Sequence, residues 1–201
     1  MQYESLCEEI EAYVVSLFQQ HPVPALLYHN LEHTRRVVAS CKEIAAYYNL
    51  GEDDRFVLQA AAWFHDSGHL VGDMEHHEEN GSLLMKRYFE DKGIDAEIVA
   101  RIAGCIMATK YPSHPHNLLE EIICDADTYH FGTSYFQVTD ELVRQELEVR
   151  LHLHFAHWHI KALQLLMQHH FFTVYCRQLL EAGKQMNIEY LQKKIKEEEK
   201  A

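Results

Sequence analysis

Three segments of the chain carry histidine and aspartate side chains that could bind a metal ion. YHNLEHTRRV contains His33, AAWFHDSGH ends an apolar run with His65 and Asp66 side by side, and CDADTYHFG contains Asp127. Imidazole nitrogens and carboxylate oxygens form mixed sites that suit a divalent transition metal, or magnesium when water supplies more of the ligands. The residue types therefore predict a metal site made by His33, His65, Asp66 and Asp127, provided that the fold brings them together.

Helical spacing indicates that both histidines face the core. His33 precedes Val37 by four residues, and Cys41 continues the same face of the helix. His65 follows the apolar residue Leu58 at a spacing that also returns to one face. Asp66 comes where this helix ends, so its side chain can reach the same cavity.

The distal aspartate is chosen by the same argument. Asp127 lies on a stripe with Leu119 and Ile123, whereas Asp125 lies with Glu121 on the more polar side of the helix. We therefore expect Asp127 to be the better inward-facing carboxylate.

Each of these residues alone has an ordinary structural explanation. A single inward histidine is usually a hydrogen-bonded core residue, and a single aspartate near a helix end is usually a cap. An isolated buried carboxylate, however, costs several kcal/mol even after its surroundings relax. A bound cation explains two imidazoles and two carboxylates together, so the metal interpretation is favoured for the set.

The elements that must position these residues are helices. Apolar residues recur with a helical period along most of the chain, prolines and glycines fall at the junctions, and no segment alternates like a strand. The predicted helices cover an N-terminal segment ending before HPVP at 21–24, and then 31–49, 53–66, 76–91, 95–109, 117–130, 135–150, 155–170 and 173–197. The predicted fold class is all-α, a single-domain helical bundle.

Length and composition indicate one domain. The chain has 201 residues, of which 47% are hydrophobic, and no repeat or low-complexity linker divides it. We expect a single domain over residues 1–201, with a metal-binding region at about 25–135 and C-terminal helices at 135–198 that pack on it.

Charge and cysteine usage exclude several classes of partner. The formal net charge of −13 disfavours binding to a nucleic-acid backbone, which depends on clustered lysine and arginine. No apolar run of about 18 residues and no basic-then-apolar N-terminus is present, so neither a membrane span nor a signal peptide is expected. The 5 cysteines are widely spaced, as is typical of reduced thiols. These features predict a cytoplasmic protein with no membrane partner.

The segments that carry these residues resemble the HD-domain superfamily of metal-dependent phosphohydrolases, which is named for its His-Asp pair. The resemblance rests on YHNLEHTRRV, AAWFHDSGH, HHEENGSLL and CDADTYHFG, whose order and settings agree over about residues 25–135. It implies an all-helical bundle of the HD-domain type that holds one or two divalent ions through His33, His65, Asp66 and Asp127. The resemblance leaves the metal open among Mn, Mg, Fe, Co, Ni and Zn.

The activity implied by the resemblance is hydrolysis of a phosphate ester or anhydride on a nucleotide-like small molecule by metal-activated water. Asp66 is expected to orient the water as well as to bind metal. Phosphate oxygens need further donors, and the candidates for this role are Arg36, Lys110, His69 and His77. Lys110 and His69 are also expected to act in catalysis. His69 stands in the substrate-facing place because HDSGH lacks the lysine that many members have after HDxG.

A second metal site and two other functions stay open at this point. His77 and Glu78 open one helix and His114 and His116 lie in YPSHPH, and of these His77 and His116 are the stronger candidates for a second metal. Two iron ions would instead favour a di-iron oxygenase, and binding without cleavage would make the protein a nucleotide-sensing module. The sequence also leaves open whether the long last helix pairs with a second copy in a homodimer.

Overall fold

All regular secondary structure in the described part of the chain is helical. A computed structural model describes residues 3–200, and no strand is found among them. The predicted all-α fold class is therefore confirmed. No helix within these residues combines the length and the apolar character needed to cross a bilayer.

The described residues form two compact units. The first contains residues 3–24 and 29–127, and the second contains residues 25–28 and 128–200. The expectation of a single domain over 1–201, with helices at 135–198 packed on the metal-binding region, stays a prediction.

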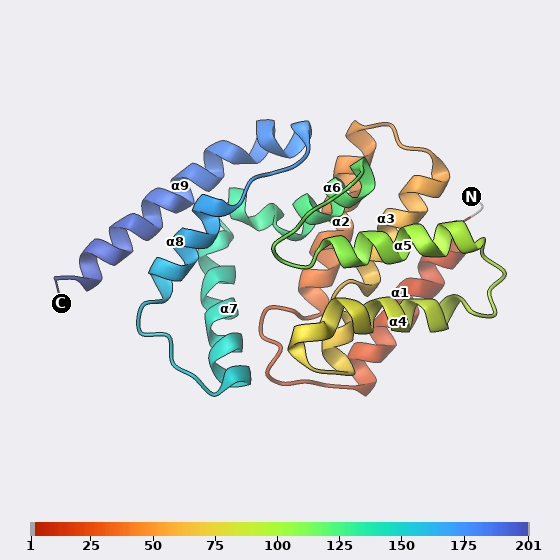
Figure 1. Cartoon of the computed structure of the whole chain (residues 1–201), viewed down its shortest axis with the longest axis horizontal. Helices are drawn as coiled ribbons and strands as arrows, with labels where there is room; N and C mark the ends of the chain where they lie inside the picture. Colours follow the sequence, from red (N-terminus) through yellow and green to blue (C-terminus); the bar gives the residue numbers. More distant parts are fainter. Residues whose placement is uncertain (1–2, 201) are drawn as a thin grey trace. The chain divides into compact units, whose positions relative to one another are not determined.

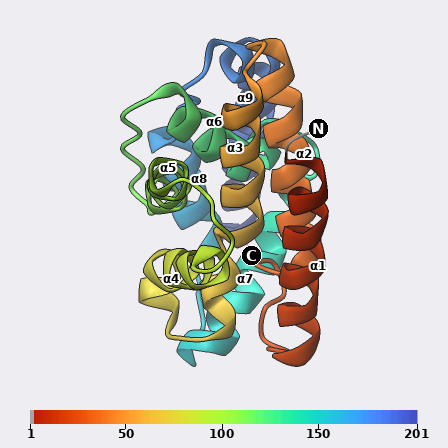
Figure 2. The same cartoon turned by 90° about the vertical axis from the view of Figure 1, so that its right-hand side faces the viewer.

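The first unit holds α1 to α6 and two short 3-10 helices. In chain order they are α1 (Glu4–Gln20), α2 (Leu31–Tyr47), α3 (Glu52–Phe64), η1 (Ser67–Leu70), η2 (Met74–His76), α4 (His77–Phe89), α5 (Ala96–Ala108) and α6 (Leu118–Asp127). Helices α1, α2 and α3 run side by side, while α4 and α5 run across them (Figures 1 and 2).

Helix α3 is the central element of this unit. From Phe56 to Phe64 every residue except Gln59 is buried. A helix that is apolar around most of its circumference needs neighbours on several sides, and α3 is contacted by α1, α2, α4, α5 and α6. The run of small residues at Ala60–Ala62 lets these neighbours approach closely.

Two glycines allow the turn after α3 to lie directly on α4. A Cβ atom at Gly68 would stand 1.9 Å from the carbonyl oxygen of His77, and one at Gly81 would stand 2.6 Å from that of Phe64. Ser67 closes the turn, since its hydroxyl donates to the Phe64 carbonyl at 2.7 Å. The end of α3 and the start of α4 are thus held against each other by backbone contact.

The second unit contains η3 (Tyr129–Gly132), α7 (Phe136–Leu151), α8 (Trp158–Gln168) and α9 (Val174–Glu198). Asn187 on α9 donates hydrogen bonds to the carbonyls of Phe131 and Thr133, at 2.9 and 2.8 Å. The short segment at 25–28 joins this unit through the buried Glu146, whose carboxylate accepts the N–H of Tyr28 at 2.8 Å.

Several helices end earlier than periodicity indicates. The helix predicted at 117–130 ends at Asp127 and is followed by η3, and the helix predicted at 155–170 covers only 158–168. The helix predicted at 53–66 ends at Phe64, so that the His-Asp pair follows it. Because η3 follows α6 and a 3-10 helix, η1, lies just after α3, apolar spacing that extends across short 3-10 turns explains the differences at 117–130 and 53–66.

Candidate metal centre

Four side chains from three parts of the first unit converge on one point. Nε2 of His33 lies 2.9 Å from Oδ1 of Asp127 and 3.3 Å from Oδ2 of Asp66. Nε2 of His65 lies 3.2 Å from the same Asp66 oxygen and 3.4 Å from Nε2 of His33. Ligand atoms of His33, His65 and Asp127 thus lie within 4.8 Å of one another, and Oδ2 of Asp66 lies beside both imidazole nitrogens.

The position of each ligand follows from its place in a helix. Asn30 caps α2 by accepting hydrogen bonds from the backbone N–H groups of Glu32 and His33, which fixes the first turn that carries His33. His65 and Asp66 directly follow the buried α3, and Asp127 is the last residue of α6. Because α6 packs against both α2 and α3, its last residue can meet the other three.

The spacing between these atoms matches a set of ligands on one cation. Ligand atoms at about 2.1 Å from a metal are about 3.0 Å apart at adjacent octahedral positions and about 3.4 Å apart in a tetrahedron. Nδ1 of His65 lies 2.8 Å from the carbonyl oxygen of Ala62, which can only accept, so Nδ1 carries hydrogen. Nε2 is left to face the centre, as a metal-binding imidazole requires.

The electrostatics of the cluster also favour a cation. Burial opposes the charged form of His65, but Asp66 and Asp127 raise the pKa of this imidazole well above its usual value. Burial likewise opposes ionisation of Asp66, yet His65, and then His29 and His33, hold the pKa of Asp66 well below its usual range. The pKa of Asp127 is lowered in the same way by His33 and His65. Both carboxylates are therefore anionic at neutral pH.

One buried oxygen shows that the residues fit a metal ion. Oδ2 of Asp66 has no hydrogen-bond partner in the described part of the chain, although Asp66 is almost completely buried. An anionic oxygen in that position needs a positive charge beside it, which a protonated His65 supplies in the metal-free protein and a bound cation would supply in its place. His33, His65, Asp66 and Asp127 would hold that cation.

A second cluster adjoins the first through the other oxygen of Asp66. Ligand atoms of Asp66, His69 and His77 lie within 4.8 Å of one another. The rings of His69 and His77 are stacked with centroids 3.9 Å apart, and Nε2 of His77 lies 3.8 Å from Oδ1 of Asp66. Asp66 thus offers one oxygen to each cluster.

His29 is a neighbour of the site that the sequence reasoning missed. Its ring centroid lies 4.9 Å from that of His69 and 5.9 Å from that of His33. The available signal was its spacing of four residues from His33, but His29 precedes the cap of α2 and is therefore outside the helix.

The expectation for Asp125 was wrong. Asp125 was placed on the polar side of its helix, yet it is 0% exposed. Helix α6 packs against α2, α3 and α5, so more than one of its faces is covered.

Of the predicted phosphate donors, Lys110 and Arg36 lie at the protein surface, as does His116, whereas His69 is buried. Nζ of Lys110 is 2.6 Å from Oε1 of Glu79, and Arg36 forms an i,i+4 ion pair with Glu32 at 3.2 Å. His116 is exposed and belongs to neither of the two ligand groups found among residues 3–200. Their roles, and the roles of all the predicted site residues, stay predictions.

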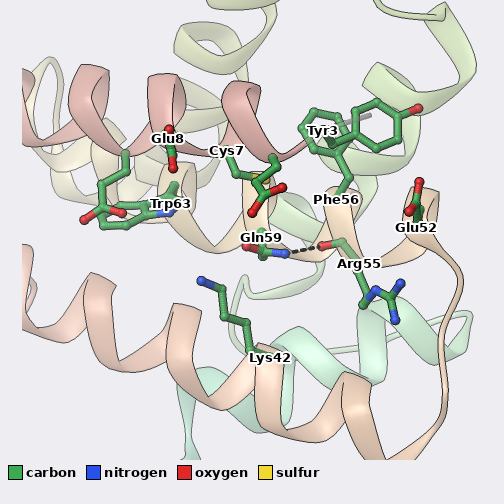
Figure 3. A pocket seen from close by; sticks show the side chains of 11 residues that line it. Tyr3, Cys7, Glu8, Lys42, Glu52, Arg55, Phe56, Gln59 and Trp63 are labelled. Carbon is green, nitrogen blue, oxygen red and sulfur yellow. Dashed lines mark hydrogen bonds between the residues drawn. The ribbon is translucent and has the colours of Figure 1, made fainter. Parts of the chain in front are cut away.

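A cavity of about 410 Å³ lies between α1, α2 and α3, and none of the predicted site residues lines it (Figure 3). Its walls carry both acidic and basic side chains, including Glu8, Glu11, Lys42 and Arg55. With both signs of charge present, the lining does not select one class of ligand.

Comparison with known proteins identifies the family of the chain. The model of the HD domain matches residues 30–132, which is just over half of the chain and contains all four residues of the first cluster. Searches of curated proteins and of solved structures found no match. The chain belongs to the HD domain family.

Proposed function

We propose that this protein is a metal-dependent phosphohydrolase that cleaves a phosphate ester or anhydride of a nucleotide-like small molecule. The observation that supports it is the convergence of His33, His65, Asp66 and Asp127, from α2, the end of α3 and α6, on one centre. Bound there, a divalent ion supplies Lewis acidity and lowers the pKa of a water ligand, which is the chemistry that hydrolysis of a phosphate needs.

The side chains of the chain have separate parts in this reaction. His33, His65 and Asp127 would hold the ion, and Asp66 would both bind it and orient the attacking water. His69, buried against His77, lies on the Asp66 Oδ1 side of the centre, where a substrate oxygen is to be bound.

Lys110 and Arg36 are proposed to bind the phosphate from the surface. Both are cations already paired with carboxylates, Glu79 and Glu32 respectively. Surface pairs of this kind are worth little in water, so a phosphate dianion can replace the carboxylate as the partner of either cation.

A direct assay tests the proposal. Chelator-treated full-length protein is loaded with manganese, magnesium, cobalt or iron, and each form is tested against nucleotides, cyclic nucleotides and generic phosphate esters. We expect metal-dependent product formation with one of these classes. Asp66→Asn should lower kcat by about 10²–10⁴-fold, because the metal ion loses an anionic ligand and the attacking water loses the carboxylate that orients it.

Asp91→Asn is the control, because Asp91 is an exposed aspartate outside both clusters. It should leave turnover unchanged. Full turnover by Asp66→Asn, or a protein that takes up no divalent ion under any loading, would rule the proposal out.

The second cluster favours one alternative, a di-iron oxygenase on the same fold. His29, His69 and His77 gather beside Asp66, so the centre has enough imidazoles for a second iron. Oxygen-dependent turnover of the iron-loaded protein would support this reading. Anaerobic activity with manganese would oppose it.

A further inference from the structure

His29 lies beside the metal centre but outside every helix. Its ring centroid lies 4.9 Å from that of His69 and 6.4 Å from that of His77. Residues 21–30, which join α1 to α2, form no helix. Because the repeating hydrogen bonds of a helix do not hold this segment, other partners have to satisfy its buried backbone groups and fix its path.

The two residues that flank His29 have such partners. On one side, the side-chain oxygen of Asn30 accepts two backbone N–H groups in the first turn of α2, at 2.9 and 3.2 Å. On the other side, Tyr28 is 8% exposed, and its backbone N–H donates to Oε2 of Glu146 at 2.8 Å. The backbone is thus anchored immediately before and immediately after His29.

Glu146 is a buried carboxylate of α7 and follows Tyr28 by 118 residues. It is 0% exposed, and its Oε1 is paired with Arg150 at 3.2 Å. A buried ion pair adds little stability compared with apolar side chains of similar volume. The specific feature that Glu146 offers is an acceptor for one backbone N–H at the entrance to His29.

We propose that Glu146 is a positioning residue for His29. By holding the N–H of Tyr28, it fixes the peptide that leads into His29, whose ring packs beside His69. The inference rests on the proposed function for the part that His69 has in binding substrate, whereas the placement of His29 is measured by itself. Glu146 belongs to the second compact unit, so that unit acts on the reaction through the backbone of residues 25–28.

The imidazole signals of His29 test this assignment without a metal and without turnover. Chelator-treated full-length protein is labelled with ¹⁵N in its histidine rings, and His29→Gln and His65→Gln assign the two signals of interest. Glu146→Leu removes the acceptor, so the His29 signals should move toward those of solvent-exposed histidine. The His65 signals should stay, because His65 directly follows α3 and is bonded to the carbonyl oxygen of Ala62.

Two further variants show whether the hydrogen bond is the cause. Glu146→Gln keeps an oxygen that can accept the Tyr28 N–H, so it should retain the His29 signals of the wild type. Glu141→Gln is the matched control on the same helix. Glu141 is exposed, and its side-chain partners among residues 3–200 are Arg144 and Gln145. It should leave both histidine signals unchanged.

The effect on the reaction follows from the same displacement. In the metal-loaded protein, Glu146→Leu should lower kcat/KM by about 10–100-fold, because a misplacement of about 1 Å near the reacting atoms can cost that much. Glu146→Gln should retain most of the activity. If Glu146→Leu fails to fold, the double variant Glu146→Leu with Arg150→Leu replaces it, since it removes both members of the ion pair.

The outcomes separate this inference from the proposed function. Unchanged His29 signals in Glu146→Leu would overturn the positioning role and leave the phosphohydrolase proposal standing. Equal movement of the His65 signals would also overturn it, because the whole site would then have loosened. Movement in Glu146→Gln as large as in Glu146→Leu would overturn the role of the acceptor. Displacement of His29 alone, in a protein without metal-dependent turnover, would support the placement and overturn the proposed function.

Discussion

His65 is the residue whose protonation a bound cation has to change. In the metal-free protein Asp66 and Asp127 raise its pKa well above the usual 6.5, despite burial, so its Nε2 carries a proton at neutral pH. A folded-state pKa above the unfolded value stabilises the fold below about pH 6.5, and this contribution is lost as pH rises through the raised pKa. The lowered pKa values of Asp66 and Asp127 also stabilise the fold above about pH 3.8, their usual value. This stabilisation is lost as pH falls below 3.8 toward the lowered pKa values.

Metal binding should therefore release the His65 proton. We expect the affinity for Mn²⁺ to rise with pH, by up to about tenfold per pH unit while His65 is protonated, because ion and proton compete for one nitrogen. Calorimetric titration in two buffers of different protonation enthalpy counts the protons released. An affinity that is the same at about pH 6 and about pH 8 would contradict this competition.

The contact between η1 and α4 positions the His-Asp pair at the scale of elements. The Cα atoms of Gly68 and Gly81 lie against backbone, so the end of α3, which carries His65 and Asp66, sits directly on the helix that carries His77. The distance between the two clusters depends on this approach.

A methyl group at Gly81 should separate the two elements. Gly81→Ala places a Cβ 2.6 Å from the Phe64 carbonyl and 3.1 Å from that of His65, so we expect a stability loss of about 1–3 kcal/mol and weaker metal binding. Urea unfolding and Mn²⁺ titration measure the two effects.

Gly104→Ala is the matched control within a helix. Its Cβ would meet only the Glu120 carboxylate at 3.3 Å, the mobile end of a side chain. Helix propensity favours the substitution by about 0.5–1 kcal/mol, so it should be neutral or stabilising. Equal losses at Gly81 and Gly104 would show that the backbone contact is not the cause.

In the whole molecule, the residues of both clusters belong to one of the two compact units. His33, His65, Asp66, His69, His77 and Asp127 all lie between residues 29 and 127. A ligand that binds only the folded state stabilises the residues whose unfolding releases it.

Metal binding should therefore slow hydrogen exchange more in the helices that carry the ligands than in the other helices. At a free ion concentration of 100 times Kd we expect about 2.7 kcal/mol of added stability. Hydrogen exchange should slow most in α2, α3 and α6, and least in α7, α8 and α9. Exchange is compared with and without chelator. If the metal slowed exchange equally in all six helices, the expectation that it stabilises mainly the unit with the ligands would be contradicted.

The helical fold class and the inward direction of His33 and His65 could be predicted from the sequence, because both depend on local spacing along one helix. His33 and His65 are buried as their spacing indicates. The order of four short segments also carried the family resemblance, which the HD domain match over residues 30–132 confirms.

How these helices meet could not be predicted in this way, because it depends on packing between them. Periodicity tells which face of a helix is apolar, but it does not tell how many neighbours cover the helix, so it misplaced the buried Asp125 on α6. Nor does it place residues outside helices, such as His29, or distinguish the buried Glu78 from the paired Glu79 next to it. Those positions depend on contacts between segments far apart in the chain, and such contacts leave no periodic signal in any one of them.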